Sequence, residues 1–424
     1  MSFDWLTKPL GEIVSFRTGK LDSNASEDNG KYPFFTCSPI TLRINDFAFD
    51  TEAVILAGNN ANGVFSTKHY SGKFNAYQRT YVIEPLNLKE VSCRYIYFVI
   101  SHMVSHLQEL AIGTSTKFLT KTILNGLTIH LPPKIEQDQI AVLLSSLDDR
   151  IALLRETNTT LEAIAQALFK SWFVDFDPVH AKQACRERSR TEGREPEGVD
   201  SDTAALFPDS FEESELGLVP SGWQVTNLAD AFEINPTRTL KKGSIAPYLE
   251  MAKLATSGHC VETPIQREMG SGAKFRNGDT LLARITPCLE NGKSAFVDFL
   301  EDDQIGWGST EFLVLRPKAP LPEYFAYLLC RHPIFREYAI QSMSGTSGRQ
   351  RIQNDVLGRY LLALPDDGVA SAFTEVVDSI QKSIAGNHET AQTLATLRDT
   401  LIPRLISGQL RLPDANALIE ETTA

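Results

Sequence analysis

The sequence lacks several features that would assign it to a common class of protein. It has no run of about 18 apolar residues, which a membrane-spanning helix needs, and its first residues lack the basic-then-apolar pattern of a secretory signal. Its six cysteines are scattered and include no Cys-x-x-Cys pair, which favours reduced thiols in a cytoplasm and disfavours a zinc site. We therefore expect a cytoplasmic protein without a metal and without contact to a membrane.

Motifs of nucleotide and methyl-transfer chemistry are also missing. No Gly-x-x-x-x-Gly-Lys-Ser/Thr loop is present for an ATPase, and no glycine fingerprint follows the first expected strand. The (Asn/Asp/Ser)-Pro-Pro-aromatic motif of amino-methyltransferases is absent, since Ser38-Pro39-Ile40 matches it poorly. We expect no catalytic residues and no cofactor in this chain.

A long segment without glycine or proline, residues 135–177, follows the first globular part. Its first and fourth heptad positions are mostly apolar, with charges between them, which is typical of a coiled-coil helix. At about 1.5 Å per residue the helix would span roughly 55–60 Å and would need a partner. The first positions are Ile140, Leu147, Leu154, Leu161 and Leu168, and the fourth are Leu144, Ile151, Asn158, Ala165 and Trp172.

The partner lies 233 residues further on. Adding 233 gives Phe373, Ile380, Asn387, Leu394 and Leu401 for the first column, and Val377, Ile384, Ala391, Arg398 and Leu405 for the second. Gly113-Thr114-Ser115 also repeats as Gly345-Thr346-Ser347, and Trp5–Leu10 repeats as Trp223–Leu228 at offset 218. We therefore predict an internal duplication, in which each copy is a globular part followed by a long helix. In the second helix, from about Ser371 to Ile406, we expect interruptions at Gly386 and Pro403.

The net charge of −12 is unevenly distributed. Residues 186–215 carry ten acids against four arginines, a net charge of −6, which indicates an acidic linker. Residues 1–131 carry eleven acids and twelve bases, and residues 216–364 carry fifteen and sixteen. Each globular part can therefore present a basic face to a nucleic acid.

Short strands bounded by turns fill the globular parts. Ala53–Ala57, Thr80–Ile83 and Leu127–Leu131 read as strands, and Tyr95–Leu110 reads as one buried helix. Asp279–Arg284 takes the place of Glu52–Ala57 in the second copy. This mixture predicts an α+β fold.

Five stretches form a specific pattern together with the two-fold layout. They are Leu131-Pro132-Pro133-Lys134-Ile135-Glu136-Gln137, Ser171-Trp172-Phe173-Val174-Asp175-Phe176-Asp177-Pro178, Thr203-Ala204-Ala205-Leu206-Phe207-Pro208, Glu215-Leu216-Gly217-Leu218-Val219-Pro220-Ser221-Gly222-Trp223 and Gly345-Thr346-Ser347-Gly348-Arg349-Gln350-Arg351-Ile352. With these stretches the chain resembles the specificity subunit of type I restriction–modification enzymes, over nearly its whole length. The second helix departs from the family pattern, with Asp366-Asp367-Gly368 where the first has Lys134-Ile135-Glu136.

The resemblance implies a division into two pseudo-symmetric target-recognition domains and two spacer helices packed as an antiparallel coiled coil. The domains would be residues 1–131 and 217–364, the helices 132–177 and 365–410, the linker 178–216 and the tail 411–424. Each domain would read one half of a split sequence in double-stranded DNA, and the helices would set the gap and dock two methyltransferase subunits. Restriction subunits could join them. S-adenosylmethionine and ATP with Mg²⁺ would belong to the partner subunits.

An antiparallel pair also predicts a register, because first-position residues then face fourth-position residues of the partner. The register that fits places Asn158 opposite Asn387, their numbers summing to 545, and Trp172 opposite Phe373 by the same sum. Two facing asparagines would satisfy each other and penalise slipped registers. A slip of one heptad, or two solvated asparagines on an ordinary bundle, are the alternatives.

Residues that contact DNA are expected in the loops. What the two copies share should contact the DNA backbone, and what differs should read bases. Asparagine can pair bidentately with adenine and arginine with guanine, although a solvated surface charge is the alternative for each. The candidates are Asn59, Asn60, Asn62, Lys68, Lys73, Arg79 and Lys117 in the first copy, and Lys241, Lys242, Arg276, Arg284, Lys293, Arg349 and Arg351 in the second.

Two other classes remain open on the sequence alone. One is a coiled-coil scaffold or adaptor that binds proteins and not DNA. The other is a fused restriction enzyme that carries both recognition and methyl transfer, against which the missing catalytic motifs and the length argue. A gel shift with and without a methyltransferase partner separates these classes.

Overall fold

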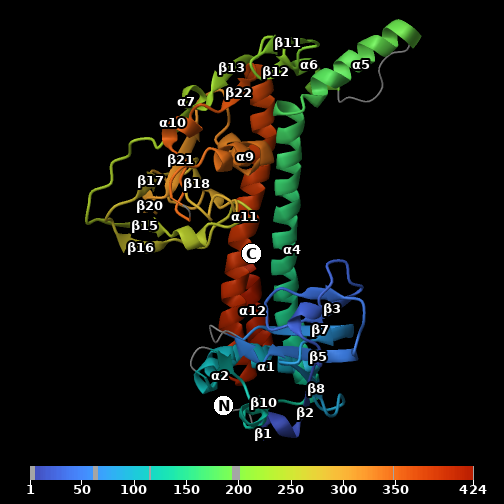
Figure 1. Ribbon diagram of the computed structural model, residues 1–424. Coiled ribbons are helices and arrows are strands. Elements are labelled where there is room, and N and C mark those ends of the chain that lie inside the picture. Colours follow the sequence, from blue (N-terminus) through green and yellow to red (C-terminus); the bar gives the residue numbers. More distant parts are fainter. Residues whose placement is uncertain (1–4, 61–64, 114–115, 193–200, 347, 424) are drawn as a thin grey trace. The chain divides into compact units, whose positions relative to one another are not determined.

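The computed structural model describes residues 5–60, 65–113, 116–192, 201–346 and 348–423, with side chains except at 187–203 and 422–423 (Figure 1). The chain divides into two compact units, one formed by Met1–Ala152 with Ala391–Ala424 and the other by Leu153–Thr390. Each unit mixes helices and strands, so the α+β prediction is confirmed. Asn62, Thr114, Ser115 and Ser347 lie outside the described residues.

A six-stranded sheet forms the globular part of the first unit, in the order β2-β8-β5-β7-β3-β4. Its strand β5 is fully buried from Ala53 to Ala57, and Phe35, Phe49 and Phe74 pack on it. The strands β1 and β10, and likewise β6 and β9, form two further two-stranded sheets in this part. The strands are β1 (Leu6–Pro9), β2 (Val14–Thr18), β3 (Tyr32–Phe35), β4 (Leu42–Ile44), β5 (Phe49–Ala57), β6 (Asn59–Asn60), β7 (Thr67–Ala76), β8 (Thr80–Pro85), β9 (Lys117–Phe118) and β10 (Thr128–Leu131).

The segment predicted as one buried helix forms two. Helix α1 (Cys93–His102) ends at Met103, whose backbone N–H bonds to the carbonyl of Val99, and α2 (Val104–Leu110) follows at once. The apolar pattern runs through Met103 without glycine or proline, so the sequence carries no signal for this break. The short helices α3 (Lys121–Asn125), η1 (Leu10–Glu12) and η2 (Ser23–Ala25) complete this part.

The globular part of the second unit contains two four-stranded sheets, ordered β14-β21-β18-β19 and β16-β15-β20-β17, and the pairs β13-β22 and β11-β12. Its strands are β11 (Phe211–Ser214), β12 (Gly217–Pro220), β13 (Gln224–Asn227), β14 (Phe232–Ile234), β15 (Ile245–Leu249), β16 (Ile265–Glu268), β17 (Ala273–Phe275), β18 (Thr280–Ala283), β19 (Ser294–Phe296), β20 (Gly306–Gly308), β21 (Phe312–Pro317) and β22 (Leu361–Leu364). Its short helices are α7 (Leu228–Ala231), η3 (Met251–Lys253), α8 (Phe325–Arg331), α9 (Pro333–Gln341) and α10 (Asn354–Leu357).

Strand pairing confirms the predicted duplication. Leu6 pairs with Leu131 between β1 and β10, and Gln224 pairs with Leu364 between β13 and β22, at the offsets of 218 and 233 read from the sequence. The triplet β2-β8-β5 of the first unit likewise corresponds to β14-β21-β18 of the second. The two copies therefore share a sheet core and differ in the strands added to it.

The two long helices are α4 (Lys134–Phe173) and α11 (Asp367–Ile406). In the second unit they pack antiparallel, with Asn387 Nδ2 donating to Asn158 Oδ1 at 2.9 Å and the rings of Trp172 and Phe373 5.6 Å apart. Both pairs sum to 545, as the predicted register requires. The side chain of Asn158 also donates to the backbone carbonyl of Ile384 at 3.0 Å.

Within the first unit the same two helices also run antiparallel. Arg398 Nη1 of α11 donates to Asp148 Oδ1 of α4 at 2.6 Å. Helix α11 is continuous through Gly386 and Pro403, so the expected interruptions are wrong. Packing of its apolar face outweighs the weak local propensity at these positions. Helix α12 (Leu412–Thr423) follows it.

Both long helices begin at defined contacts. The amide of Gln137 is fully buried, and its Nε2 donates to the carbonyls of Glu90 and Pro132 while its Oε1 accepts from the backbone N–H of Ser92. In the second copy the carboxylate of Asp366 accepts from the N–H of Val369 at 2.9 Å. This cap places the start of α11 four residues before the expected Ser371.

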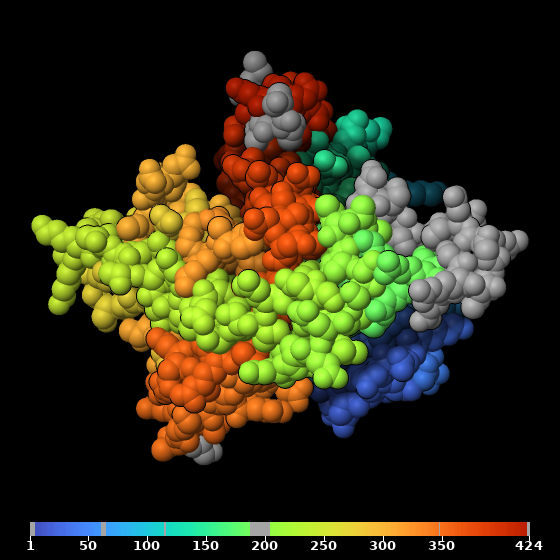
Figure 2. All heavy atoms as spheres, turned by 90° about the horizontal axis from the view of Figure 1, so that it is seen from above, coloured from blue at the N-terminus to red at the C-terminus, as the bar shows by residue number. Residues whose placement is uncertain are grey.

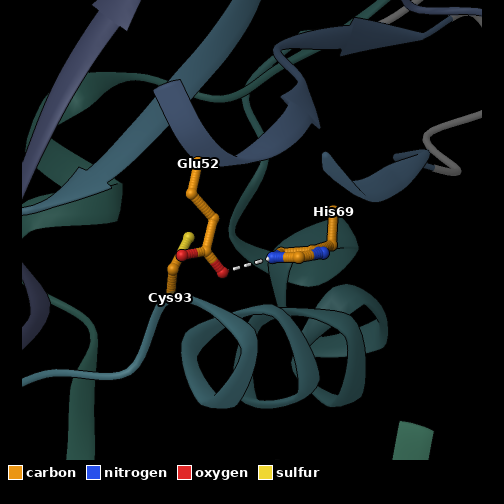
Figure 3. A group of neighbouring side chains, drawn as sticks. All are labelled: Glu52, His69 and Cys93. Carbon is orange, nitrogen blue, oxygen red and sulfur yellow. Dashed lines mark hydrogen bonds and ion pairs between the residues drawn. The ribbon is translucent and has the colours of Figure 1, made fainter. Parts of the chain in front are cut away.

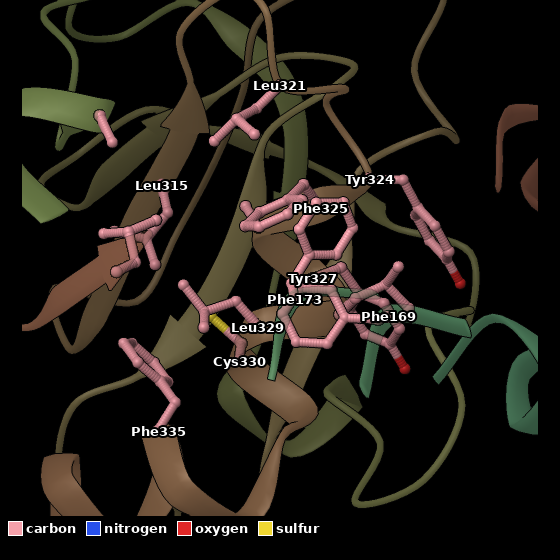
Figure 4. Close-up of a cluster of buried hydrophobic side chains, with 14 of the residues drawn as sticks. Phe169, Phe173, Leu315, Leu321, Tyr324, Phe325, Tyr327, Leu329, Cys330 and Phe335 are labelled. Carbon is pink, nitrogen blue, oxygen red and sulfur yellow. The ribbon is translucent and has the colours of Figure 1, made fainter. Parts of the chain in front are cut away.

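An aromatic cluster fixes the end of α4 in the second unit. Figure 4 shows Phe169 and Phe173 of α4 beside Phe325 and Tyr327 of α8. The ring of Phe173 lies 5.1 Å from that of Phe325 and 4.6 Å from that of Phe373 on α11. Buried aromatic pairs of this kind each contribute roughly 0.5–1.5 kcal/mol beyond their area burial, so they orient the helices against the β sheet of this unit.

The segment expected to be an acidic linker contains regular structure. It includes α5 (Asp177–Glu192), α6 (Ser201–Leu206) and the hairpin β11-β12. Phe207 packs on Trp172 with ring centroids 5.0 Å apart, which ties the segment to α4. Figure 2 shows the residues that follow α6, in lime green, on the surface beside the orange residues of the second unit. Among the residues described, no helix is both long and apolar enough to cross a membrane.

Candidate nucleic-acid interface

The end of strand β5 is the centre of the candidate interface in the first copy. The backbone N–H of Gly58 donates to the carbonyl of Arg79 at 2.8 Å, and the N–H of Leu119 donates to the carbonyl of Gly58 at 2.8 Å. Asn59 and Asn60 then pair with Phe118 and Lys117. The structure thus brings together three of the loops from which the candidates were drawn.

The second copy repeats these two backbone hydrogen bonds with other side chains, around Arg284 in place of Gly58. We call this shared arrangement the duplicated frame. The N–H of Arg284 donates to the carbonyl of Glu311, and the N–H of Ile352 donates to the carbonyl of Arg284, both at 3.0 Å. Arg284 therefore corresponds to Gly58 and not, as the sequence alignment of the copies proposed, to Ala57. The corresponding stretches Ala53–Ala57 and Thr280–Ala283 are buried throughout, so they lack the polar–apolar alternation that would fix the register from sequence.

Each copy has one arginine at the duplicated frame, but the two arginines adjoin different strands: Arg79 precedes β8, and Arg284 follows β18. In the first it is Arg79, which is exposed and lies over the ring of Phe118, 5.6 Å from its centroid. In the second it is Arg284, whose Nη2 donates to the carbonyl of Ile352 at 2.7 Å and to Gln353 Oε1 at 3.1 Å. The shared backbone with different charged side chains is what a pair of modules with different sequence preferences would need.

The leading glycines of the two loops have similar backbone conformations. Gly113 has φ +123° and Gly345 has φ +130°, a region that side chains with a Cβ rarely adopt. A Cβ on Gly113 would lie 2.0 Å from the carbonyl oxygen of Thr116. A β bridge spans each loop, from Ile112 to Phe118 in the first copy and from Ser344 to Arg351 in the second. A basic residue, Lys117 or Arg351, therefore lies beside or at each bridge.

Two arginines of the second loop have different surroundings. Arg351 forms a bidentate pair with Glu311, with Nη2–Oε1 at 2.6 Å. Its guanidinium lowers the pKa of the Glu311 carboxyl through the hydrogen bond and the charge. Arg349 is exposed on the same loop. Arg349 is thus placed to reach a ligand, whereas Arg351 is held by the protein.

Several other candidates lie away from this frame or are held by backbone contacts. Lys68 donates to the carbonyl of Ser38 and to Thr41 Oγ1, and burial lowers its pKa. Lys73 lies opposite Asp50 in the β5–β7 strand register, at the far end of β7 from Thr67, which lies opposite Leu56 near the end of β5. Lys293 is held in the same way as Lys68, since its Nζ donates to the carbonyl of Met251. Three further candidates are exposed in loops of the second copy, namely Lys241, Lys242 and Arg276.

A basic cleft of about 420 Å³ beside Arg284 was missed by the sequence analysis. Arg238 and Lys274 line it together with Arg284. Arg238 belongs to the loop after β14 and Lys274 to β17. They are far apart in sequence and follow no local motif, so the duplication, which was the main signal, could not reveal them.

A mixed group of potential metal ligands lies in the first copy, where the sequence predicted none. Glu52, His69 and Cys93 come from β5, β7 and the start of α1, and their donor atoms all lie within 4.8 Å of one another (Figure 3). His69 Nε2 is 2.8 Å from Glu52 Oε1. Burial, together with the carboxylates of Glu52 and Glu84, raises the pKa of the Cys93 thiol to about 12. Metal binding would have to displace this proton, and the hydrogen bond between His69 and Glu52 beside a buried thiol accounts for the arrangement without a metal.

Comparison with known proteins gives consistent relatives. Residues 3–163 match the type I restriction modification DNA specificity domain. The type I restriction enzyme EcoDI specificity subunit of Escherichia coli is 36% identical over 296 residues, which are 68% of this chain and 63% of the relative. The HindI specificity subunit of Haemophilus influenzae is 25% identical over 382 residues, 78% of this chain and 80% of the relative. The chain thus spans less than two thirds of the length of the EcoDI subunit.

A crystal structure of the type I restriction–modification S subunit from M. genitalium has the same fold. It matches with a TM-score of 0.58 at 15% sequence identity, over 95% of this chain and 96% of that one. Fold and loops together define an internally duplicated α+β protein whose copies are joined through paired antiparallel helices. Residues 3–163 match the DNA specificity domain of type I restriction–modification enzymes, and the chain is similar to specificity subunits of these enzymes over most of its length.

Proposed function

We propose that this chain is the non-catalytic DNA-recognition subunit of a type I restriction–modification complex. Each globular part would bind one half of a split, asymmetric sequence in double-stranded DNA. The single observation that supports this most is the duplicated frame around Gly58 and Arg284, in which one backbone geometry carries different charged side chains. Backbone geometry common to both copies suits contacts to phosphates, and the side chains that differ suit the reading of bases.

The helix pair would set the gap between the two half-sites. One helical turn of DNA is about 34–36 Å, and a 40-residue helix is roughly 60 Å long. Two heads attached to such a pair can bind the duplex on successive turns. The length of the helices, and not the loops, would then determine the number of unread base pairs.

Methyltransferase subunits are the proposed protein partners, with restriction subunits as a further one. The start of α4 supports a protein partner, because Ile135 and Val142 are 74% and 65% exposed on one stretch of helix. Both line a hollow that the start of α12 closes with Leu412 and Pro413. S-adenosylmethionine, and ATP with Mg²⁺, would be bound by the partner subunits and not by this chain.

A matched change in helix length tests the proposal. Removing seven residues from each long helix preserves the heptad pattern and the antiparallel pairing. In the assembled methyltransferase complex, the methylated motif should keep both half-site sequences and change the gap between them. Deletion of residues 417–423, the part of α12 that does not line the hollow, serves as the control and should leave the gap unchanged. Altered half-site sequences after the helix deletion would contradict the proposal.

A further inference from the structure

The basic cleft of the second copy has an unusual composition. It opens between the Asn235–Arg238 loop, strand β17 and the start of β21, and has a volume of about 420 Å³. Arg238, Lys274 and Arg284 contribute three positive charges to its lining. Its other polar side chains are Asn235, Thr237 and Thr310. A site of this size and charge can accommodate an anionic group.

The arginine at the base of the cleft is fixed by a buried carboxylate. Arg238 Nη2 donates to both carboxylate oxygens of Asp279, at 2.5 and 2.6 Å, and the side chain of Arg238 is 8% exposed. Asp279 is fully buried and also accepts from Arg316 Nη1 at 2.9 Å. Asp279 is therefore bonded to two guanidinium groups, and Arg316 pairs with Glu323 as well. Arg238 has its counter-charge in Asp279, so the positive charge of the cleft comes mainly from Lys274 and Arg284, for which no ion pair is found among the described residues.

Two N–H donors beside this cleft lack an acceptor. The Nε atoms of Arg238 and Arg284 are buried and have no hydrogen-bond partner among the residues that the structure describes. Buried donors of this kind are rare in folded proteins, because each unmet donor loses its hydration without compensation. Lys274 Nζ donates to the carbonyl of Arg238 at 3.2 Å and retains two further N–H groups.

Two acceptors near the cleft are already used. Asn235 Oδ1 accepts from the backbone N–H of Val314 at 2.9 Å, and Asp279 is bonded to two arginines. The lining keeps the hydroxyls of Thr237 and Thr310, which can donate as well as accept. A phosphate presents acceptors alone and carries a full negative charge, which three cationic donors from different elements suit better than the neutral edge of a base.

The first copy does not repeat this arrangement. The backbone hydrogen bonds that equate Arg284 with Gly58 also equate Asp279 with Ala53. Without a carboxylate at that position, a buried arginine like Arg238 would have no counter-charge. The cleft is thus a property of the second copy.

We propose that this cleft binds one backbone phosphate of the DNA at the second half-site, with Arg238, Lys274 and Arg284 as its ligands. The proposal rests on the proposed function of the chain and adds an individual contact to it. Within the duplicated frame it assigns Arg284 to backbone contact and leaves the reading of bases to other side chains that differ between the copies. The cleft orients the second domain on the duplex and does not select bases.

Lys274→Gln is the variant that tests this contact, because it removes one charge while its backbone neighbours stay in place. The matched control is Lys318→Gln, since Lys318 Nζ likewise donates to a backbone carbonyl, that of Asp230, and does not line the cleft. Binding of the assembled methyltransferase complex to its specific duplex is measured as a function of salt. Losing one phosphate contact should lower the slope of log affinity against log salt by about 0.9 and weaken binding about eightfold near 0.1 M salt.

The control variant should keep the wild-type slope, and Lys274→Arg should restore it. Duplexes with a single neutral methylphosphonate then locate the contact. One substitution in the second half-site should weaken binding by the wild type more than binding by Lys274→Gln, in which Arg238 and Arg284 alone still contact that phosphate. An unchanged slope for Lys274→Gln, or equal additional losses at every methylphosphonate, would overturn the phosphate assignment. If the wild-type complex bound no duplex in a sequence-dependent way, the proposed function itself would fail.

Discussion

Replacing Asn158 with leucine should destabilise the second unit, although it makes the helix interface more apolar. The side chain of Asn158 accepts from Asn387 Nδ2 at 2.9 Å and donates to the carbonyl of Ile384 at 3.0 Å. Leucine would remove both hydrogen bonds and leave the Asn387 amide facing an apolar group. The loss of stability comes mainly from Asn387 Nδ2, a donor left without its acceptor, and not from lost contact area.

The magnitude follows from these two hydrogen bonds. Each contributes roughly 0.5–1.5 kcal/mol net, and an unsatisfied buried amide costs about 1–3 kcal/mol. Both asparagines are half-buried, so water can partly replace the lost partner. We expect Asn158→Leu to lower the opening free energy of this helix segment by about 1–2 kcal/mol. Changing both asparagines to leucine should recover about 1 kcal/mol of that loss, because no amide is then left unmatched.

Hydrogen exchange of the backbone amides near residues 158 and 387 is the appropriate measurement. Two units need not unfold together, so a single unfolding free energy is not well defined for the whole chain, whereas exchange reports local opening. The double-mutant cycle gives the coupling between the two side chains. If Asn158→Leu left protection unchanged, or if the double variant lost as much as the sum of the single ones, the reasoning would be refuted.

Three further predictions concern other buried groups. Gln137→Ala should lower the local opening free energy at the start of α4 by about 2–4 kcal/mol, since three buried hydrogen bonds of roughly 1 kcal/mol each are lost. Hydrogen exchange of the amides near residues 92 and 137 measures this loss, and the exposed Gln139→Ala should change it little. Burial alone would lower the pKa of His259, but its hydrogen bond to Asp298 raises it to about 10. The charged ring thus stabilises the fold fully below pH 6.5 and loses this effect as the pH rises toward 10, so the deficit of His259→Gln relative to wild type should shrink from pH 6 to pH 10. Burial and nearby carboxylates raise the pKa of Cys93 to about 12, so mass spectrometry should find it unmodified by iodoacetamide at pH 8 in the folded protein and modified in urea.

The helices and their register could be predicted from the sequence because a heptad pattern is written into each segment and the duplication adds a second copy of it. The same logic located the loops at the end of β5, since strand ends and glycine turns have local signals. Prediction failed where tertiary contacts decide. The break at Met103 and the continuity of α11 through Gly386 depend on packing that no local pattern reports. The start of α11 at Asp367 has a local signal, the capping residue Asp366, which the sequence analysis did not use.

The candidate site was predicted in part for the same reason. Arg79, Lys117 and Arg284 lie at the shared frame, because they adjoin strands that the duplication identifies. Arg238 and Asp279 were missed, since their pairing joins residues 41 positions apart on different elements. A buried ion pair of this kind has no periodicity in sequence and becomes visible with the tertiary structure.

Mapping of methylated bases across the genome, in cells with and without this chain, tests the central claim most directly. The account predicts that one methylated motif disappears when the chain is removed, and that this motif consists of two defined segments separated by a fixed number of unspecified bases. Methylation that persisted without the chain, or a lost motif that was continuous, would contradict the assignment of one half-site to each of the two copies.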